Sequence, residues 1–332
     1  MNIALIAAAS PQRDRIFPQH LLDKLASLGA LKVNPGGNDK DSVLATMQGA
    51  DVVITSWGSP RMDAEYLDAA PDCKLILHAA GSVDPIVSDA VWARSIRVAC
   101  SSMAIGFGVA ETALGLMISA SKNFYQLNAY VHSGGWRETV EDTVVDLVDI
   151  TIGIVGAGQV GRHLIKLLQP FEVDVVVSDP YITQEACDQL GVRRVSFEEL
   201  LKVSDIVSIH APSIPETHHM FNKDTLALMK PTAGLINTAR GSIINEQDLY
   251  THMAAGKLRF ACLDVTDPEP PVRNNPLRNL HNVILLPHIA GVVNNGLARI
   301  GRHAIRELER FQKGEPCINE ITQDIMFRVG KA

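Results

Sequence analysis

The chain has 332 residues, of which 46% are hydrophobic and 20% are charged, and this composition excludes disordered, collagen-like and coiled-coil proteins. The formal net charge of −7 argues against a broad surface for nucleic acid or anionic membranes. The length predicts two domains, each large enough to bury a core. Five cysteines stand far apart without a CxxC motif, which predicts reduced thiols in a cytoplasmic protein and no zinc site.

Two apolar segments have features of targeting or membrane signals. The run over residues 1–9 has no basic residue before it, and Arg13, Asp14 and Arg15 follow at once, so we expect a buried first strand rather than a secretory signal. Residues 103–120 are apolar over the length of a membrane helix, but Glu111 lies in the middle. We therefore expect a helix buried between domains or subunits.

Short β-rich apolar runs alternate with helical patterns along the chain, which is typical of parallel sheets covered by helices. The strands expected in the first hundred residues are Ile3–Ala8, Leu31–Val33, Val52–Thr55, Lys74–His78 and Ile96–Ala99. The later strands are Thr151–Val155, Val173–Ser178, Val192–Val195, Ile206–Ile209, Gly234–Asn237, Phe260–Leu263 and Val283–Leu286. Helices are expected, among others, over Pro85–Arg94, Val160–Leu168, Gln184–Leu190, Phe197–Val203 and Asn245–Ala255. The sequence thus predicts an α/β fold with two doubly wound parallel sheets.

Two long helices are expected at the joints between these domains, over residues 104–132 and 292–311. The residues after the second helix are too few to form a domain, so they must pack on something already built, most simply the first domain. We therefore expect a discontinuous domain of residues 1–102 and 290–332, with a second domain of residues 103–289 inserted in it. A C-terminal arm that packs on a neighbouring subunit would give the same pattern.

A glycine motif follows one of the expected strands and opens a helix. It reads Gly156-Ala157-Gly158-Gln159-Val160-Gly161, a GxGxxG pattern, and Asp179 ends the next strand. The first glycine permits a tight turn, the second lets a pyrophosphate approach the backbone, and the third lets the helix meet the strand. Asp179 would accept hydrogen bonds from ribose hydroxyls. The alternative is a glycine-rich turn without a ligand.

Other polar residues also follow expected strands, and in open parallel sheets ligands bind at this edge. They are Trp57-Gly58, Ala80-Gly81-Ser82, His210-Ala211-Pro212, Thr238-Ala239-Arg240-Gly241, Asp264 and Pro287-His288. Alone, an arginine after a strand is usually in a surface ion pair, and a histidine is often structural. Together they indicate a reaction site. His218-His219 has no acidic or cysteine partner at ligand spacing, so we interpret it as solvated or structural and expect no metal.

Four segments in this order resemble the signature of the D-isomer-specific 2-hydroxyacid dehydrogenase family. They are Gly156–Gly161 with Asp179, Asn237–Glu246, Asp264–Pro270 and Pro287–Gly291, and His78–Asp84 and Val109–Glu111 resemble two further family segments. The resemblance covers nearly the whole chain. It implies a flavodoxin-like substrate domain, a Rossmann-type NAD domain inserted into it, and a homodimer built around the region after the first joint helix.

Two positions depart from the family pattern. Asp149 stands where a glycine is common before the fingerprint strand, which changes little. Ile105-Gly106-Phe107-Gly108 replaces a more polar segment near the expected hinge. Family contacts on the nicotinamide side are therefore not carried over to this segment.

The resemblance implies hydride transfer between a nicotinamide and C2 of a small 2-oxo acid. The guanidinium fork of Arg240 can bind both the carboxylate and the carbonyl oxygen of such a substrate. Backbone N–H groups after Ala80, from Gly81 to Val83, would hold the carboxylate. His288 would be the general acid and base, because histidine titrates near neutrality, and Glu269 would orient it and favour its protonated form.

The same resemblance assigns the remaining contacts. Asp179 is followed by Pro180 and Tyr181 rather than by a cation, which favours NAD over NADP. Asp264 would hold the nicotinamide carboxamide. The cofactor-binding set is Gly156, Gly158, Gln159, Val160, Gly161, Asp179, Ala211, Pro212, Thr238 and Asp264. The substrate-binding set is Ala80, Gly81, Ser82 and Arg240, and no nucleic-acid or membrane partner is expected.

Two other functions fit parts of the pattern. A nucleotide-sensing protein, such as the dehydrogenase-like transcriptional co-repressors, would keep this fold together with Arg240, Glu269 and His288. No disordered partner-binding tail is evident, which favours an enzyme. A different Rossmann enzyme, such as a relative of adenosylhomocysteine hydrolase, is not supported by the order of the Arg, Glu and His motifs.

Overall fold

The computed structural model describes residues 1–137, 143–291 and 294–329. The chain forms two compact units: unit 1 comprises Met1–Ile105 and Val292–Ala332, and unit 2 comprises Gly106–Gly291. The boundaries expected from the sequence fall after residues 102 and 289. Val292, where the second joint helix was expected to begin, lies outside the described residues.

Unit 1 contains a six-stranded sheet in the order β13-β5-β4-β3-β1-β2. The five strands β1 to β5 are parallel, whereas β13 runs antiparallel to β5. This parallel order is that of flavodoxin-like sheets. The strands are β1 (Asn2–Leu5), β2 (Ala30–Val33), β3 (Val52–Thr55), β4 (Leu75–His78), β5 (Arg97–Cys100) and β13 (Glu320–Ile321).

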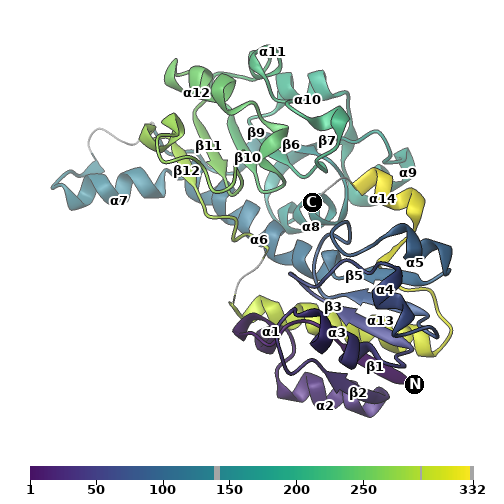
Figure 1. Ribbon diagram of the computed structural model, residues 1–332. Helices are drawn as coiled ribbons and strands as arrows, with labels where there is room; N and C mark the ends of the chain where they lie inside the picture. Colours follow the sequence, from purple (N-terminus) through teal and green to yellow (C-terminus); the bar gives the residue numbers. More distant parts are fainter. Residues whose placement is uncertain (138–142, 292–293, 330–332) are drawn as a thin grey trace. The chain divides into compact units, whose positions relative to one another are not determined.

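Alternating side chains of unit 1 enter two cores, one on each face of the sheet. Ile3 and Leu5 pack in the core with α1, α2 and α13, and Ala4 and Ile6 pack in the core with α3, α4 and α5. Figure 1 shows α13 lying beside α1, although the two helices are far apart in sequence. The helices are α1 (Pro11–Ile16), α2 (Gln19–Leu28), α3 (Lys40–Met47), α4 (Ala64–Asp68), α5 (Asp89–Ala93), α13 (Leu297–Gln312) and α14 (Gln323–Val329).

Unit 2 contains a seven-stranded parallel sheet in the order β12-β11-β10-β9-β6-β7-β8. Reversal of the order between β6 and β9 is the switch point of a Rossmann fold, where dinucleotides bind. The strands are β6 (Val148–Val155), β7 (Glu172–Ser178), β8 (Arg193–Arg194), β9 (Ile206–Ile209), β10 (Gly234–Asn237), β11 (Phe260–Leu263) and β12 (Val283–Leu285). Both units are therefore parallel-sheet α/β domains.

Helices cover both faces of the unit 2 sheet. One core contains Ile152 and Ile154 with residues of α6, α8 and α9, and the other contains Val207 and Ile209 with residues of α10, α11 and α12. The helices are α6 (Ser102–Ser121), α7 (Phe124–His132), α8 (Gln159–Leu168), α9 (Gln184–Leu190), α10 (Phe197–Val203), α11 (Lys223–Leu226) and α12 (Glu246–Ala254).

Three expected helices differ from the sequence prediction. The single helix over 104–132 is wrong, because Asn123 adopts a left-handed φ of 55° and separates α6 from α7. The helix over Pro85–Arg94 is confined to α5, which Ser88 caps at its N-terminus. The second joint helix, α13, begins only at Leu297.

The helix α6 is long and apolar enough to cross a membrane by length and composition alone. Its apolar residues have another explanation within unit 2, because Ala110, Ala113, Leu116, Met117 and Ala120 pack in the core against β6. Such packing is typical of a core helix of a folded domain.

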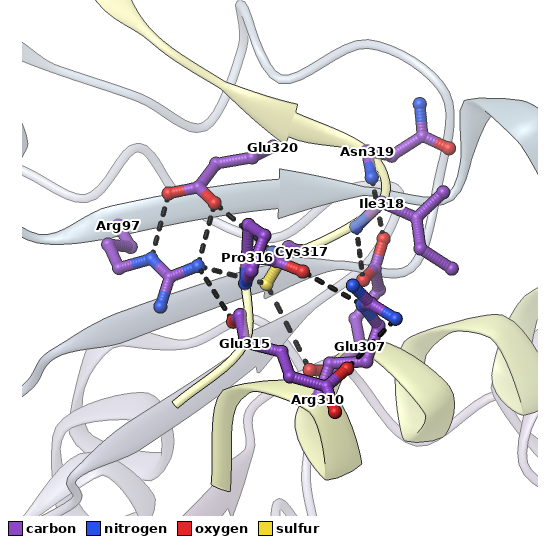
Figure 2. A network of polar contacts seen from close by, with 9 residues as sticks. All are labelled: Arg97, Glu307, Arg310, Glu315, Pro316, Cys317, Ile318, Asn319 and Glu320. Carbon is purple, nitrogen blue, oxygen red and sulfur yellow. Dashed lines mark hydrogen bonds and ion pairs between the residues drawn. The ribbon is translucent and has the colours of Figure 1, made fainter. Parts of the chain in front are cut away.

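A network of polar contacts attaches the C-terminal strand β13 to unit 1 (Figure 2). Glu307 of α13 is 1% exposed, and its carboxylate accepts hydrogen bonds from the N–H of Ile318 at 2.8 Å and of Asn319 at 2.7 Å. Arg97 of β5 donates to both carboxylate oxygens of Glu320, at 2.8 and 2.7 Å. The tail is therefore held by charged hydrogen bonds as well as by its short ladder.

Burial acts on the Glu307 carboxyl against these bonds. Desolvation alone would raise its pKa, but hydrogen bonds from His303 and from the backbone of Asn319 and Ile318 outweigh it and lower the pKa below the ordinary value. A carboxyl with a lowered pKa in the folded state stabilises the fold above its ordinary pKa. That contribution is lost as the pH falls through the folded-state pKa.

We predict that Glu307→Gln lowers the free energy of unfolding of unit 1 by about 1–3 kcal/mol at neutral pH, because the amide presents a donor to a backbone N–H. The loss of stability on acidification below pH 4.5 should also be smaller in the variant. Urea denaturation at several pH values measures both effects. Glu309→Gln, on the same helix in a surface pair with Lys24, is the control and should change little.

Candidate active site

The glycine motif forms the turn between β6 and α8. Gly156 has a φ of 94°, and a Cβ there would lie 2.8 Å from backbone atoms of His210 and Ala211. At Gly161 a Cβ would lie 2.2 Å from the carbonyl oxygen of Gly156. At Gly158 a Cβ would meet nothing within 4 Å, and no side chain caps the N-terminus of α8. Open backbone at a helix N-terminus fits a pyrophosphate group.

Asp179 directly follows β7 and lies beside this turn. Its Oδ2 accepts from the N–H of Ala157 at 2.7 Å, and its Oδ1 accepts from the N–H groups of Tyr181 and Ile182 at 2.7 and 3.1 Å. The carboxylate is thereby fixed next to the glycine turn. This is the place that a ribose would occupy if its pyrophosphate lay on α8.

Residues of the next two strand ends continue the same edge. Ala211 is buried and Pro212 half-buried after β9, and Thr238 is 7% exposed after β10. Gln159 and Val160 form the first turn of α8. All the predicted cofactor residues therefore belong to unit 2 and lie at or after the carboxyl ends of its strands.

The loop that carries Arg240 is shaped by Asn237, which is fully buried. The side-chain amide of Asn237 donates to the carbonyl oxygen of Arg240 at 2.8 Å and accepts from the N–H of Ala239 at 3.0 Å. The guanidinium Nη1 donates to the carbonyl oxygen of Ala239 at 2.8 Å. These bonds fix the backbone of Arg240 directly after β10.

Asp264 fixes the loop that carries His288. Its carboxylate accepts from the N–H groups of Ile289 and Ala290, both at 2.9 Å, and its carbonyl oxygen accepts from the N–H of His288 at 2.8 Å. Burial raises the pKa of Asp264, although the two backbone bonds oppose this. His288 has a left-handed φ of 53°, which is unfavourable for a non-glycine residue. The carboxylate compensates for this strain.

The Glu269 and His288 side chains meet as the sequence predicts. Oε2 of Glu269 lies 2.7 Å from Nδ1 of His288, and the two side chains are 38% and 48% exposed. The N–H of Thr266 donates to Oε1 of Glu269 at 3.2 Å. A half-exposed imidazole with one nitrogen bound to a carboxylate has the arrangement of a general acid and base.

Two further residues bring the Arg240 and Glu269 loops together. A Cβ at Gly241 would lie 2.1 Å from the carbonyl group of Thr266, so only glycine permits this approach. Glu246 accepts from the N–H of Asp267 at 2.8 Å and from the amide of Asn275 at 2.7 Å. Glu246 and Asn237 stand inside the motif segments, but no sequence pattern singles them out, because their role depends on which backbone they contact.

The predicted substrate residues Ala80, Gly81 and Ser82 follow β4 in unit 1. Ala80 is fully buried, and its carbonyl oxygen accepts from the N–H of Ser101 at 2.9 Å. Gly81 and Ser82 are half-buried. In the described part of the chain, the N–H groups of Gly81, Ser82 and Val83 form no hydrogen bond, so they are available to an anion.

Histidines outside the predicted site do not form a metal centre. His218 and His219 stack on each other with ring centroids 3.9 Å apart. Among the residues that the structure describes, no group of three or more His, Cys, Asp or Glu side chains could hold a metal ion.

Residues 114–290 match the family described as D-isomer specific 2-hydroxyacid dehydrogenase, NAD binding domain. The chain belongs to this family. It is 32% identical to D-3-phosphoglycerate dehydrogenase of Methanocaldococcus jannaschii over 90% of this chain and 56% of that protein. It is 30% identical to glyoxylate reductase of Thermococcus litoralis over 88% of this chain and 90% of that protein. The TT0316 protein of Thermus thermophilus superposes with a TM-score of 0.76 at 30% identity, over 97% of this chain and 100% of that one.

The chain spans about half the length of the phosphoglycerate dehydrogenases that it matches, 56% and 49% in two cases. The matched NAD-binding region covers most of unit 2, including the glycine motif, Asp179, Arg240, Glu269 and His288. Membership of the family therefore rests on the same residues that form the edge of the unit 2 sheet.

We predict that Gly158→Ala weakens NADH binding about tenfold or more without loss of stability, because the new methyl group meets only the space in front of α8. Gly161→Ala is the matched control. Its methyl group would overlap the Gly156 carbonyl, so it should lower stability by about 1–3 kcal/mol. Fluorescence titration with NADH and thermal unfolding measure the two effects. Unchanged NADH affinity in Gly158→Ala would contradict the assignment.

Proposed function

We propose that the protein is an NAD-dependent oxidoreductase that interconverts a small 2-oxo acid and a D-2-hydroxy acid, with His288 as general acid and base. The observation that carries this proposal is the Glu269–His288 pair at 2.7 Å, on loops that follow the strands of a dinucleotide-binding sheet. NADH, when bound, supplies the hydride to C2 of the oxo acid. The residues of the chain must then hold the acid, polarise its carbonyl and move one proton.

Proton transfer falls to Nε2 of His288. Nδ1 is engaged by Glu269, so Nε2 is the nitrogen left to face a substrate. In reduction the protonated ring gives its proton to the carbonyl oxygen, and in oxidation the neutral ring takes it from the hydroxyl group. The Glu269 carboxylate favours the protonated ring and fixes its orientation.

Arg240 holds the substrate. Its planar guanidinium can donate to the carboxylate and to the carbonyl oxygen together, and it places positive charge where the oxygen becomes anionic. The free N–H groups of Gly81 to Val83 bind the same carboxylate. Asp264, Thr238, Ala211 and Pro212 contact the cofactor, and Asp179 accepts from the ribose hydroxyls and disfavours a 2′-phosphate.

The deciding experiment is an NADH-oxidation screen over glyoxylate, hydroxypyruvate, phenylpyruvate, 2-oxoisocaproate and phosphohydroxypyruvate. We expect turnover with one or more acids and lower kcat/KM with NADPH. Arg240→Lys should lose about 2–4 kcal/mol of transition-state stabilisation while NADH affinity stays nearly unchanged, because lysine lacks the fork. NADH binding without turnover of any acid would favour the nucleotide-sensing function instead.

We further predict that Glu269→Gln changes the pH profile of kcat/KM. Reduction needs the protonated imidazole, so its rate falls at alkaline pH, and oxidation shows the opposite limb. Without the carboxylate the imidazole loses its proton at lower pH, so the alkaline limb for reduction should move toward acid. His288→Ala should remove the limb and lower the rate by roughly two to four orders of magnitude. Superimposable wild-type and Glu269→Gln profiles would refute the pairing.

We also propose that the chain forms a homodimer through α7 and the residues after it. None of the residues of α7 is buried, and Figure 1 shows this helix projecting from the rest of unit 2. Its apolar side chains Phe124, Tyr125 and Val131 are 54%, 53% and 49% exposed, and Trp136 is 62% exposed. An apolar surface of this kind is typical of an interface between subunits. All five cysteines are free and buried, which supports a reducing, cytoplasmic location.

We predict that Val131→Asp converts the dimer to a monomer, since the charge would be buried in the interface. Light scattering after size-exclusion chromatography gives the mass. Asn128→Asp places the same charge at an exposed position of the same helix and should leave the mass unchanged. A wild-type protein that is monomeric at micromolar concentration would overturn this assignment.

A further inference from the structure

His78 is the last residue of β4 and directly precedes the loop of residues 79–83, the substrate loop. The side chain is 3% exposed, and no role follows for it from the proposed chemistry. Its Nδ1 lies 2.8 Å from Oγ1 of Thr55, the parallel neighbour of His78 in β3. The ring is thus fixed beneath the loop rather than directed at a ligand.

The second polar contact of the ring is with the backbone of Ser82. This contact favours the protonated ring, so the backbone group is the carbonyl of Ser82, an acceptor. Burial lowers the pKa of His78 to about 4, and the ring is therefore neutral with one N–H. Because Nδ1 accepts from the Thr55 hydroxyl, that N–H is on Nε2 and donates to Ser82.

The carbonyl groups of the substrate loop are occupied in the same way. Ala79 accepts from the hydroxyl group of Ser56 at 3.0 Å, and Val83 accepts from the N–H groups of Ile86 and Val87, both at 2.9 Å. With the bond from Ser101 to Ala80, four of the five carbonyls have donors inside unit 1. Peptide units whose carbonyls are held inside present their N–H groups outward, where an anion can bind.

We propose that His78 is a positioning residue for carboxylate recognition: its Nε2–H holds the Ser82 carbonyl so that the N–H groups of Gly81, Ser82 and Val83 face the substrate carboxylate. This inference rests on the proposed function of the substrate loop. The ring does not touch the substrate. It acts through the orientation of the peptide groups between residues 81 and 83.

Two substitutions separate this role from simple core filling. The side-chain nitrogen of glutamine reaches the position of Nε2, so His78→Gln keeps a donor for Ser82. The side-chain oxygen of asparagine lies near the position of Nδ1, so His78→Asn keeps the bond with Thr55 but loses the donor. His20→Asn, at an exposed position of α2, is the matched control.

The expected result is a change in KM that His78→Gln rescues. His78→Asn should raise KM for the reduced 2-oxo acid about tenfold, the equivalent of one hydrogen bond, with kcat and NADH affinity nearly unchanged. His78→Gln and His20→Asn should stay within about twofold of the wild type. Equal KM in all variants, or equal losses in His78→Asn and His78→Gln, would overturn the proposal, and so would a lower melting temperature without a change in KM.

A binding measurement tests the inference apart from turnover. Hydrogen exchange of the amides of residues 81–83 is followed with NADH and the unreactive 2-oxo acid analogue oxamate. Exchange should slow on addition of oxamate in the wild type and in His78→Gln, and much less in His78→Asn. If the wild type reduces no 2-oxo acid, the proposed function fails while this result still decides the role of His78. No slowing in the wild type would overturn that role.

Discussion

A hydrogen bond from a loop N–H to a buried polar side chain is the interaction on which the candidate site depends. Parallel strands end at one edge of a sheet, and the backbone beyond that edge has no ladder partner. Asp179, Asn237 and Asp264 each follow or end a strand, and each accepts from loop N–H groups at 2.7–3.1 Å. Glu307 does the same for the C-terminal segment. Each such side chain fixes a loop and satisfies donors that would otherwise be lost.

The strained backbone of His288 illustrates how this interaction serves chemistry. A left-handed conformation costs a non-glycine residue about 1–2 kcal/mol. The three bonds from the His288 loop to Asp264 maintain it, and Nδ1 then reaches Glu269 while the ring stays half-exposed. A relaxed loop would lose this orientation. Strain of this kind is common where a side chain must be held toward a reactant.

The sequence predicts the strands better than the polar contacts. Continuous apolar runs define β3, β9, β10 and β11 with the observed bounds, because both faces of these strands are buried. The strand β13 was missed, since its two residues form no apolar run, and no local pattern at Asn123 indicates the break between α6 and α7. Motifs identified Arg240, Glu269 and His288. The contacts of Glu246 and His78 join residues 21 and 23 positions apart, and no local pattern encodes such distances.

The discontinuity of unit 1 has a consequence during synthesis on the ribosome. Leu297, Ile300 and Leu308 of α13 cover the face of the sheet that contains Ile3 and Leu5, and these residues are separated by the whole of unit 2. The nascent chain therefore carries an incomplete hydrophobic core while unit 2 emerges with all its strands. Unit 2 can fold first, whereas unit 1 closes only after the last helix has left the exit tunnel. Until then its apolar face is a surface for chaperones or for aggregation.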